Sequence, residues 1–199
     1  MQPNTLKKPR CMWLNLKNPL YVHYHDFEWG RPVKNDQKHF EMLTLEGAQA
    51  GLSWETVLNK RERYREVFHN FDVQKVSRIT PKRLAKILKD PGIIRNKLKV
   101  ESTVSNAAAF IEIQKEFGSF NDYIWSYVNS KPIINARRNM EDYPSSTPLS
   151  DKISKDLKAR GFRFVGSTIV YAYMQASGLV QDHSEDCFLG GMKFRKPHP

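Results

Sequence analysis

Apolar side chains recur along this chain at intervals of three and four residues, which is the spacing of an amphipathic α-helix. Between residues 36 and 51, Phe40, Leu43 and Gly47 or Ala48 recur at about this spacing. Ser53 can cap a following helix, because its hydroxyl oxygen can accept a hydrogen bond from a first-turn backbone amide. One face of that helix is formed by Trp54, Val57, Leu58, Arg61, Tyr64 and Phe68. We therefore expect two consecutive helices in this part of the chain.

Capping residues predict further helices in the rest of the chain. Thr80 followed by Pro81 is typical of a helix beginning, and Ser119 can open another helix. A polar, lysine-rich helix is expected over 150–160 and a last helix over 166–177. Nowhere do apolar and polar residues alternate convincingly, as they do in a half-buried strand. The prediction is an all-α fold.

The segment 131–147 is rich in Pro, Asn, Ser and Arg and shows no helical spacing. It is interpreted as a long surface loop that joins two helical parts. A flexible linker between two domains is the alternative, but the 52 residues after it would make a poor domain alone. We therefore expect a basic tail over 1–10 and a single domain over 11–199.

Charge and cysteine content narrow the class of protein. The 199 residues carry a formal net charge of +11, which favours a polyanion such as nucleic acid or an anionic membrane surface. No apolar run is long enough for a signal peptide or a membrane span, so a soluble, cytoplasmic protein is expected. Two cysteines exclude a disulfide framework and fit a reducing compartment.

The stretch "LKDPGIIRNKLKV" at 88–100 lies between two helical patterns. A tight Pro91-Gly92 turn between two helices can direct backbone amides toward a phosphate at a helix N-terminus. Positive charge stands beside the turn at Arg95, Lys97 and Lys99. An ordinary turn between two surface helices is the alternative interpretation.

Glu46 stands in "LEGAQAGLSW", among apolar, small and amide residues, where an unpaired carboxylate would be costly. It could pair with one of the 32 basic residues, lie on the exposed face of its helix, or meet a cationic or hydrogen-donating ligand. Nearby, "PLYVHYHDFEWG" concentrates Tyr21, Tyr24, Phe27 and Trp29 within nine residues. Such clusters are usually core, but aromatic faces also stack on bases and attract delocalised cations.

These motifs, together with "FEMLTLEGAQAGLSWETVLNKRERYREVF", "LKARGFRFVGSTIVYAYMQASGLVQDH" and a terminal H-x3-C, resemble the 3-methyladenine DNA glycosylase I family. The resemblance extends from Cys11 to Cys187 and keeps the order of five separated motifs. It implies a helix-hairpin-helix glycosylase fold of two helical lobes, with a zinc ion joining the chain ends. It also implies excision of 3-methyladenine from alkylated double-stranded DNA without strand cleavage. A monomer is the default expectation for a single-domain DNA repair enzyme. Its hairpin would contact DNA through Pro91, Gly92, Ile93, Arg95 and Lys97.

The family's zinc ligands match Cys11, His25, His183 and Cys187 in this sequence. Two thiolates and two imidazoles suit tetrahedral zinc and leave no open coordination position, so the resemblance implies one structural zinc ion per chain. His23 is a competitor for His25, but the motif aligns through His25.

For the base pocket, the resemblance implies Tyr21, Tyr24, Glu46 and Trp54, with Trp29 adjacent. Methylation at N3 leaves the base formally cationic in the nucleotide, so it is already a good leaving group. Glu46 is therefore expected to be the catalytic carboxylate. It would balance the positive charge and accept hydrogen bonds from the exocyclic amine, rather than donate a proton.

Two features differ from other hairpin glycosylases. The first aspartate after the hairpin is Asp122, in a segment that does not resemble the usual motif, so the group that positions the attacking water is unnamed. The lysine nucleophile of bifunctional relatives is replaced by Asn96, and Lys97 points about 100° away on a helix. A monofunctional glycosylase is the prediction. A non-hydrolysing lesion-binding protein and a zinc-stabilised DNA-binding module without a base pocket are the alternatives.

Overall fold

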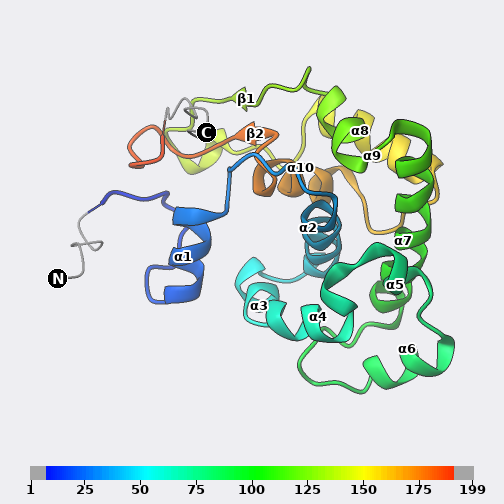
Figure 1. The fold of residues 1–199 in the computed structure, drawn as a ribbon. Helices are drawn as coiled ribbons and strands as arrows, with labels where there is room; N and C mark the ends of the chain where they lie inside the picture. The colour runs from blue at the N-terminus through cyan, green and yellow to red at the C-terminus, as the bar shows by residue number, and fades with distance from the viewer. Residues whose placement is uncertain (1–7, 191–199) are drawn as a thin grey trace, which may run out of the picture.

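The computed structural model describes residues 8–190, and this part of the chain is mostly helical (Figure 1). Its α-helices are α1 (Pro19–Phe27), α2 (Asp36–Gln49), α3 (Trp54–Leu58), α4 (Arg61–Val67), α5 (Val73–Ser77), α6 (Pro81–Ile87), α7 (Lys97–Phe117), α8 (Phe120–Ser126), α9 (Pro148–Ala159) and α10 (Ser167–Ala176). Its other regular elements are the 3-10 helices η2 (His69–Phe71) and η3 (Met140–Asp142) and the strands β1 (Ile133–Ile134) and β2 (Val180–Gln181). The prediction of a predominantly helical fold is confirmed.

Several helices begin where their capping residues predict. The hydroxyl groups of Ser53, Thr80 and Ser119 each accept a hydrogen bond from a first-turn backbone amide, in α3, α6 and α8 respectively. Each bond satisfies an amide that has no acceptor inside its own helix. Local sequence signals therefore determine where these elements begin.

The helix expected from Trp54 to Phe68 is divided into α3 and α4. The backbone amide of Lys60 bonds to the Val57 carbonyl, three residues earlier, so the helical hydrogen-bond ladder tightens and is interrupted there. The predicted apolar face is nevertheless kept, because both short helices pack against the same core. Buried members of this face include Val57, Leu58, Tyr64 and Phe68.

The strands β1 and β2 were not expected from the sequence. They pair in parallel, with Ile133 opposite Val180 and Ile134 opposite Gln181. A strand of two residues is too short to show alternation, so its pairing is decided by tertiary contacts. The pair joins the 131–147 segment to the chain after α10.

Helix α1 was also not predicted, because the sequence analysis interpreted its residues only as an aromatic cluster. Asn18 caps it by accepting hydrogen bonds from the amides of Leu20 and Tyr21, and Pro19 occupies the first helical turn. This is a standard helix beginning. The aromatic side chains are compatible with the helix, and Tyr21 and Tyr24 pack it against the core.

Helix α2 lies at the centre of the fold and packs against α3, α7 and α10 (Figure 1). The buried apolar side chains form one connected cluster that extends from Cys11 to Leu189. Among the described residues, no helix is both long and apolar enough to cross a membrane.

The two ends of the described chain meet beside α1 (Figure 1). The backbone amide of Phe188 donates to the Pro9 carbonyl, and the Arg10 guanidinium donates to both carboxylate oxygens of Asp26 on α1. Pro9 and Arg10 belong to the tail expected over 1–10, of which residues 1–7 lie outside the described range. The structure therefore anchors the final part of that segment.

Candidate active site

A cavity of about 280 Å³ opens between α1, the end of α2, the beginning of α3, α10 and the 131–147 segment. Its lining consists of Trp13, Tyr21, Tyr24, Trp29, Glu46, Gln49, Trp54, Met140, Tyr143, Pro144, Ala172 and Gln175. All five side chains that the sequence analysis assigned to a base pocket are among them. They come from two separate stretches of sequence, 19–30 and 45–54, and the fold brings them to one cavity.

Glu46 is the carboxylate of this cavity. Helix α2 buries it, with 3% of the residue exposed, and its Oε2 atom has no hydrogen-bond partner among the described residues. Burial raises its pKa from the ordinary value of 4.5 to about 8, because charge is costly away from water. The structure thus excludes the alternative of a helix-surface residue, and no described basic group pairs with Glu46. An unpartnered buried carboxylate in a cavity is suited to a ligand that donates hydrogen bonds or carries positive charge.

Aromatic rings surround this carboxylate. The Tyr24 and Trp54 rings lie 5.2 Å apart between centroids, and the Trp13 and Trp29 rings lie 4.8 Å apart. Trp54 also buries its Nε1 donor without a partner among the described residues. Flat apolar walls and a few unsatisfied polar atoms can hold a planar heteroaromatic ligand.

The sequence analysis missed one wall of the cavity. Met140, Tyr143 and Pro144 come from the 131–147 segment, which was interpreted only as a surface loop. No local pattern could have identified them, because a 3-10 helix of three residues and the irregular backbone after it are too short to show a periodic face. Trp13 and Gln49 were also missed, although both lie within four residues of a residue or motif already singled out.

A buried carboxylate holds this segment against the rest of the fold. Asp182 is fully buried and accepts hydrogen bonds from Asn135 and Arg137 of the segment, at 2.7 and 3.0 Å. It also accepts hydrogen bonds from Tyr171 and Gln175 of α10, at 2.5 and 2.8 Å. The cavity wall is therefore tied to α10 by one carboxylate that has four donors.

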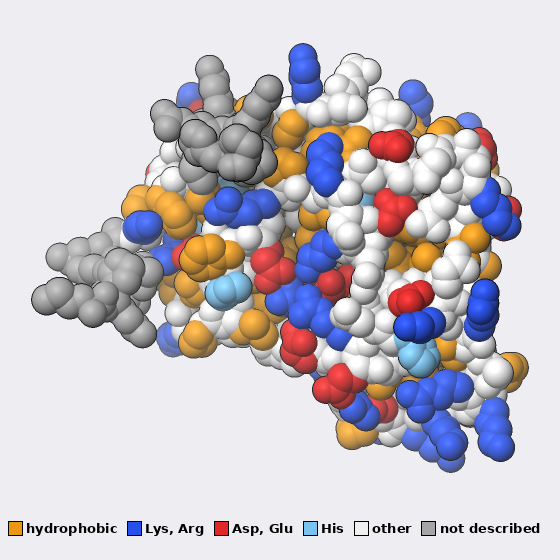
Figure 2. All heavy atoms as spheres, in the orientation of Figure 1, with side chains coloured by type: hydrophobic (Ala, Val, Ile, Leu, Met, Phe, Trp, Pro, Cys, Tyr) orange, Lys and Arg blue, Asp and Glu red, His pale blue; other side chains and the backbone are white. Residues whose placement is uncertain are grey.

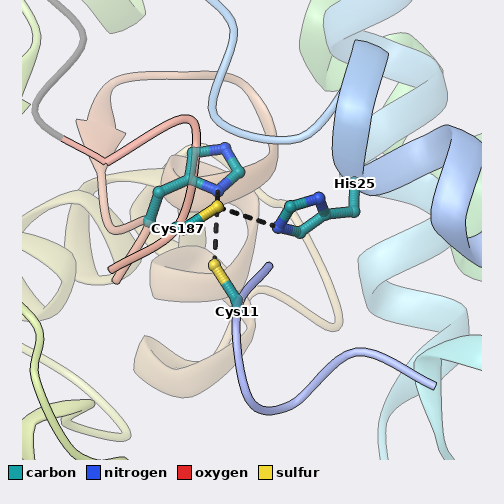
Figure 3. A group of neighbouring side chains, drawn as sticks. Cys11, His25 and Cys187 are labelled. Atoms are coloured by element: carbon teal, nitrogen blue, oxygen red, sulfur yellow. Dashed lines mark hydrogen bonds between the residues drawn. The ribbon is translucent and has the colours of Figure 1, made fainter. Parts of the chain in front are cut away.

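Beside the cavity, Cys11, His25, His183 and Cys187 form a buried cluster. One possible donor atom from each residue lies within 4.8 Å of the others. Figure 3 shows Cys11, His25 and Cys187 converging from the N-terminal segment, α1 and the C-terminal segment. His23, the competing histidine of α1, has a side chain that is 60% exposed and is not part of the cluster.

The surroundings of the cluster fit a metal ion. His25 directs Nε2 toward the Cys187 sulfur and Nδ1 toward Asp26, while His183 directs Nδ1 toward both sulfurs and Nε2 toward the Trp29 carbonyl. With those inner nitrogens on a metal, each outer N–H would donate to an oxygen, the arrangement usual for metal-bound histidine. The backbone amides of Ser184 and Leu189 donate to the two sulfurs, which suits thiolates. The four residues can therefore hold a metal ion.

The two thiols of the cluster influence each other's pKa. A hydrogen bond from Cys11 lowers the pKa of Cys187, and both histidines lower it further. The same bond, together with burial, raises the pKa of Cys11. A cation between the two sulfurs would favour the thiolate form of both.

Gly30 lies against the cluster at a backbone φ of +73°. A Cβ atom there would stand 2.7 Å from Gln181 Oε1 and 3.2 Å from His183 Nε2. Glycine is therefore required here by both the backbone conformation and the space.

The expected hairpin is formed by α6, the Pro91-Gly92 turn and α7. Its turn is fixed to α4 by the Arg63–Asp90 ion pair and by a hydrogen bond from Lys60 to the Pro91 carbonyl. The amide of Gly92 donates to the Asp90 carboxylate, so this amide is already engaged.

The predicted DNA-contacting residues of the hairpin differ in exposure. Pro91, Arg95 and Lys97 are exposed and Gly92 is half-buried, whereas Ile93 is buried in the core with 2% exposed. The Ile93 side chain therefore anchors the turn and is not presented to solvent. Figure 2 shows Lys and Arg side chains gathered over this part of the molecule, where α6 carries exposed Lys82, Arg83 and Lys86.

The other two residues discussed at the hairpin have local structural roles. The Asn96 side chain caps α7 by accepting a hydrogen bond from the Lys99 amide. Asp122 lies in the first turn of α8 and is not part of the cavity lining. Neither residue stands where it could act on a ligand in the cavity.

The methyladenine glycosylase family model matches residues 13–190. The chain belongs to this family. A DNA-3-methyladenine glycosylase of Haemophilus influenzae is 47% identical over 178 residues, which are 89% of this chain and 96% of that protein.

Solved structures of the family share the fold. A crystal structure of 3-methyladenine DNA glycosylase I superposes with a TM-score of 0.89 at 46% identity, covering 92% of this chain and 100% of that one. A variant of 3-methyladenine DNA glycosylase I in complex with 3-methyladenine superposes with a TM-score of 0.84 at 36% identity, covering 86% and 92%. The resemblance inferred from the motifs is confirmed.

Proposed function

We propose that this protein is a monofunctional DNA glycosylase that hydrolyses the N-glycosidic bond of 3-methyladenine in alkylated double-stranded DNA. The observation that carries the proposal is the buried carboxylate of Glu46 inside an aromatic cavity, which has no partner within residues 8–190. It is supported by relatives named DNA-3-methyladenine glycosylase and by a family member that binds 3-methyladenine.

The target nucleotide must leave the base stack before it can enter the cavity, and a damaged base costs less to extrude than a sound one. Inside, the aromatic faces of Tyr24 and Trp54 attract the delocalised cation. The Glu46 carboxylate accepts hydrogen bonds from the exocyclic amine and balances the positive charge. An undamaged, neutral base gains less from the same carboxylate, because ionising Glu46 in the cavity is costly without a cation.

The absence of strand cleavage has a structural basis. Among the described residues, no lysine lines the cavity, so the lining offers no amine nucleophile to attack the sugar. The base is already activated by methylation, and water is the proposed nucleophile at the anomeric carbon. Glu46 is the carboxylate in the lining, and we assign no separate residue to positioning the water.

We further propose that Cys11, His25, His183 and Cys187 hold one structural zinc ion. Two thiolates and two imidazoles are the donor set that zinc prefers, and four protein ligands leave no position for substrate. The ion would supply cross-linking of the chain ends next to Trp29, which lines the cavity. Thiolate ligands need a reducing compartment, which supports a cytoplasmic location. Because the cavity and hairpin belong to one chain, a monomer suffices.

Release of free base from methylated duplex DNA tests the function directly. We expect chromatographic detection of free 3-methyladenine and abasic sites, with strand breaks appearing only after alkali. Binding of methylated DNA without base release would instead identify a lesion-binding protein. Binding without preference for methylated DNA, again without release, would identify a general DNA-binding module.

We predict that Lys97 contacts a DNA phosphate, because its side chain is 75% exposed beside the hairpin turn. Each phosphate contact on duplex DNA contributes about −0.9 to the slope of log K against log salt concentration. Lys97→Met should therefore make that slope shallower by about one, measured by titrating a labelled duplex at several salt concentrations. An unchanged slope would show that Lys97 makes no such contact.

A further inference from the structure

Helix α2 carries Glu46 and ends at Gln49, but it has no basic residue in its own last turn. The last carbonyls of any helix have no partner inside it and carry partial negative charge. Here the ammonium group of Lys99 supplies that partner from another helix. Its Nζ atom donates to the carbonyl oxygens of Ala48 at 2.8 Å and Ala50 at 2.5 Å.

Lys99 is itself held firmly at the beginning of α7. Its backbone amide donates to the Asn96 side chain at 3.1 Å, and its carbonyl accepts from the hydroxyl groups of Ser102 and Thr103. Partial burial lowers the pKa of the ammonium group, as expected for a charge withdrawn from solvent into a cap. Lys99, counted in the sequence analysis among the positive charges beside the turn, is therefore engaged within the fold.

The cap connects two functional parts of the molecule. On one side, the Lys99 ammonium contacts the carbonyls of Ala48 and Ala50. These carbonyls flank Gln49, which lines the cavity together with Glu46. On the other side, Lys99 belongs to the first turn of α7, the second helix of the hairpin. A single side chain therefore ties the proposed DNA-binding element to the proposed base-binding helix.

We propose that Lys99 is a positioning residue for base recognition: by capping α2 from the hairpin helix, it sets the orientation of the helix end that presents Glu46 and Gln49. The inference rests on the proposed glycosylase function. Misplacement of a binding group by about 1 Å can cost on the order of a hundredfold in rate, so even a small shift of this turn has a measurable effect.

Lys97 provides a matched control two residues away. It has the same side chain on the same helix turn, but it is exposed and lies 3.8 Å from Glu101. If position near the hairpin were all that mattered, Lys97→Met and Lys99→Met would affect the same step. The two proposals instead give Lys97 a role in DNA contact and Lys99 a role in positioning the pocket.

The experiment compares wild type, Lys99→Met, Lys99→Arg and Lys97→Met in three measurements made well below the unfolding temperature of each variant. These are the affinity for free 3-methyladenine by calorimetry, the single-turnover excision rate at saturating enzyme, and the salt dependence of binding to unmodified duplex. For Lys99→Met we expect roughly tenfold loss in base affinity and in excision rate, with the salt slope unchanged. Lys99→Arg, which keeps a cationic donor, should recover part of both losses. Lys97→Met should change the salt slope and leave free-base affinity as in wild type.

Two results would overturn the inference. Equal base affinity and excision rate in folded Lys99→Met and wild type would show that the cap does not position the pocket. A salt slope shallower by about one in Lys99→Met would identify a phosphate contact instead. Failure of the glycosylase function is distinguishable from both, because wild type itself would then release no base and bind no 3-methyladenine.

Discussion

Glu46→Gln is expected to weaken binding of free 3-methyladenine and slow excision by roughly ten- to a hundredfold, with duplex binding nearly unchanged. Glutamine keeps the shape and one acceptor oxygen but removes the negative charge. That charge balances the cationic base of the nucleotide, and it strengthens the hydrogen bond accepted from the exocyclic amine of the neutral free base. Loss of a hydrogen bond to a charged group costs about 1.5–3 kcal/mol, and about 1.4 kcal/mol corresponds to one decade. Calorimetry of the free base and single-turnover kinetics on methylated duplex measure the two effects.

The same carboxylate should produce a characteristic pH dependence. Its pKa of about 8 means that it is largely protonated near neutral pH in the empty cavity, so kcat/KM should rise with pH up to about 8. The cationic base favours the ionised form, so the corresponding limb of kcat should lie at lower pH. Both limbs should vanish in Glu46→Gln.

Stability supplies the folding control for this variant. Because the folded-state pKa of Glu46 lies above its ordinary value of 4.5, its neutral form stabilises the fold at low pH, and this contribution is lost as pH rises through about 8. Glu46→Gln should therefore unfold at the same or a higher temperature than wild type at pH 9.

One outcome would contradict the role of Glu46 in base recognition. If Glu46→Gln bound the free base as tightly as wild type but excised it several decades more slowly, Glu46 would act on the transition state or on the water instead.

Cys187→Ala is expected to remove the bound zinc and to lower the free energy of unfolding by roughly 4 kcal/mol or more, since loss of a metal site is among the largest single-residue effects. For a chain of this size that corresponds to a fall of roughly 10 °C in unfolding temperature. Metal binding is coupled to folding here because the four ligands come from both ends of the chain. Elemental analysis should find one zinc per wild-type chain, and calorimetry should record the lower unfolding temperature.

His23→Ala is the matched control, because His23 lies on the same helix but outside the cluster. It should keep one zinc per chain and the wild-type unfolding temperature. Chelation should lower the unfolding temperature of wild type and His23→Ala but not that of Cys187→Ala. Well under half an equivalent of zinc in wild type never exposed to chelator, together with no effect of chelation, would mean that the cluster is only four buried, hydrogen-bonded side chains.

The sequence by itself determined the helical class and many helix beginnings, and it singled out Glu46 and the Cys-His cluster as candidate site residues. Ser53, Thr80 and Ser119 cap helices through bonds that span three residues, so these signals are local and readable. The position of Glu46 within an apolar stretch was also a local signal. The four residues of the Cys-His cluster were identified through family motifs, although Cys11 and His183 are 172 positions apart.

Only the tertiary structure decided how these parts act on one another. Met140, Tyr143 and Pro144 form a cavity wall because Asp182 bonds both to their segment and to α10. The elements of that segment are too short to show in the sequence which side faces inward. The packing of the helices also decides that no basic group of the described part of the chain reaches Glu46. The raised pKa of Glu46 follows from the same burial. Two lysines two positions apart, Lys97 and Lys99, have the same local signals but different partners. The end of α2 lies within reach of one and not the other, and that proximity exists only once the helices have packed.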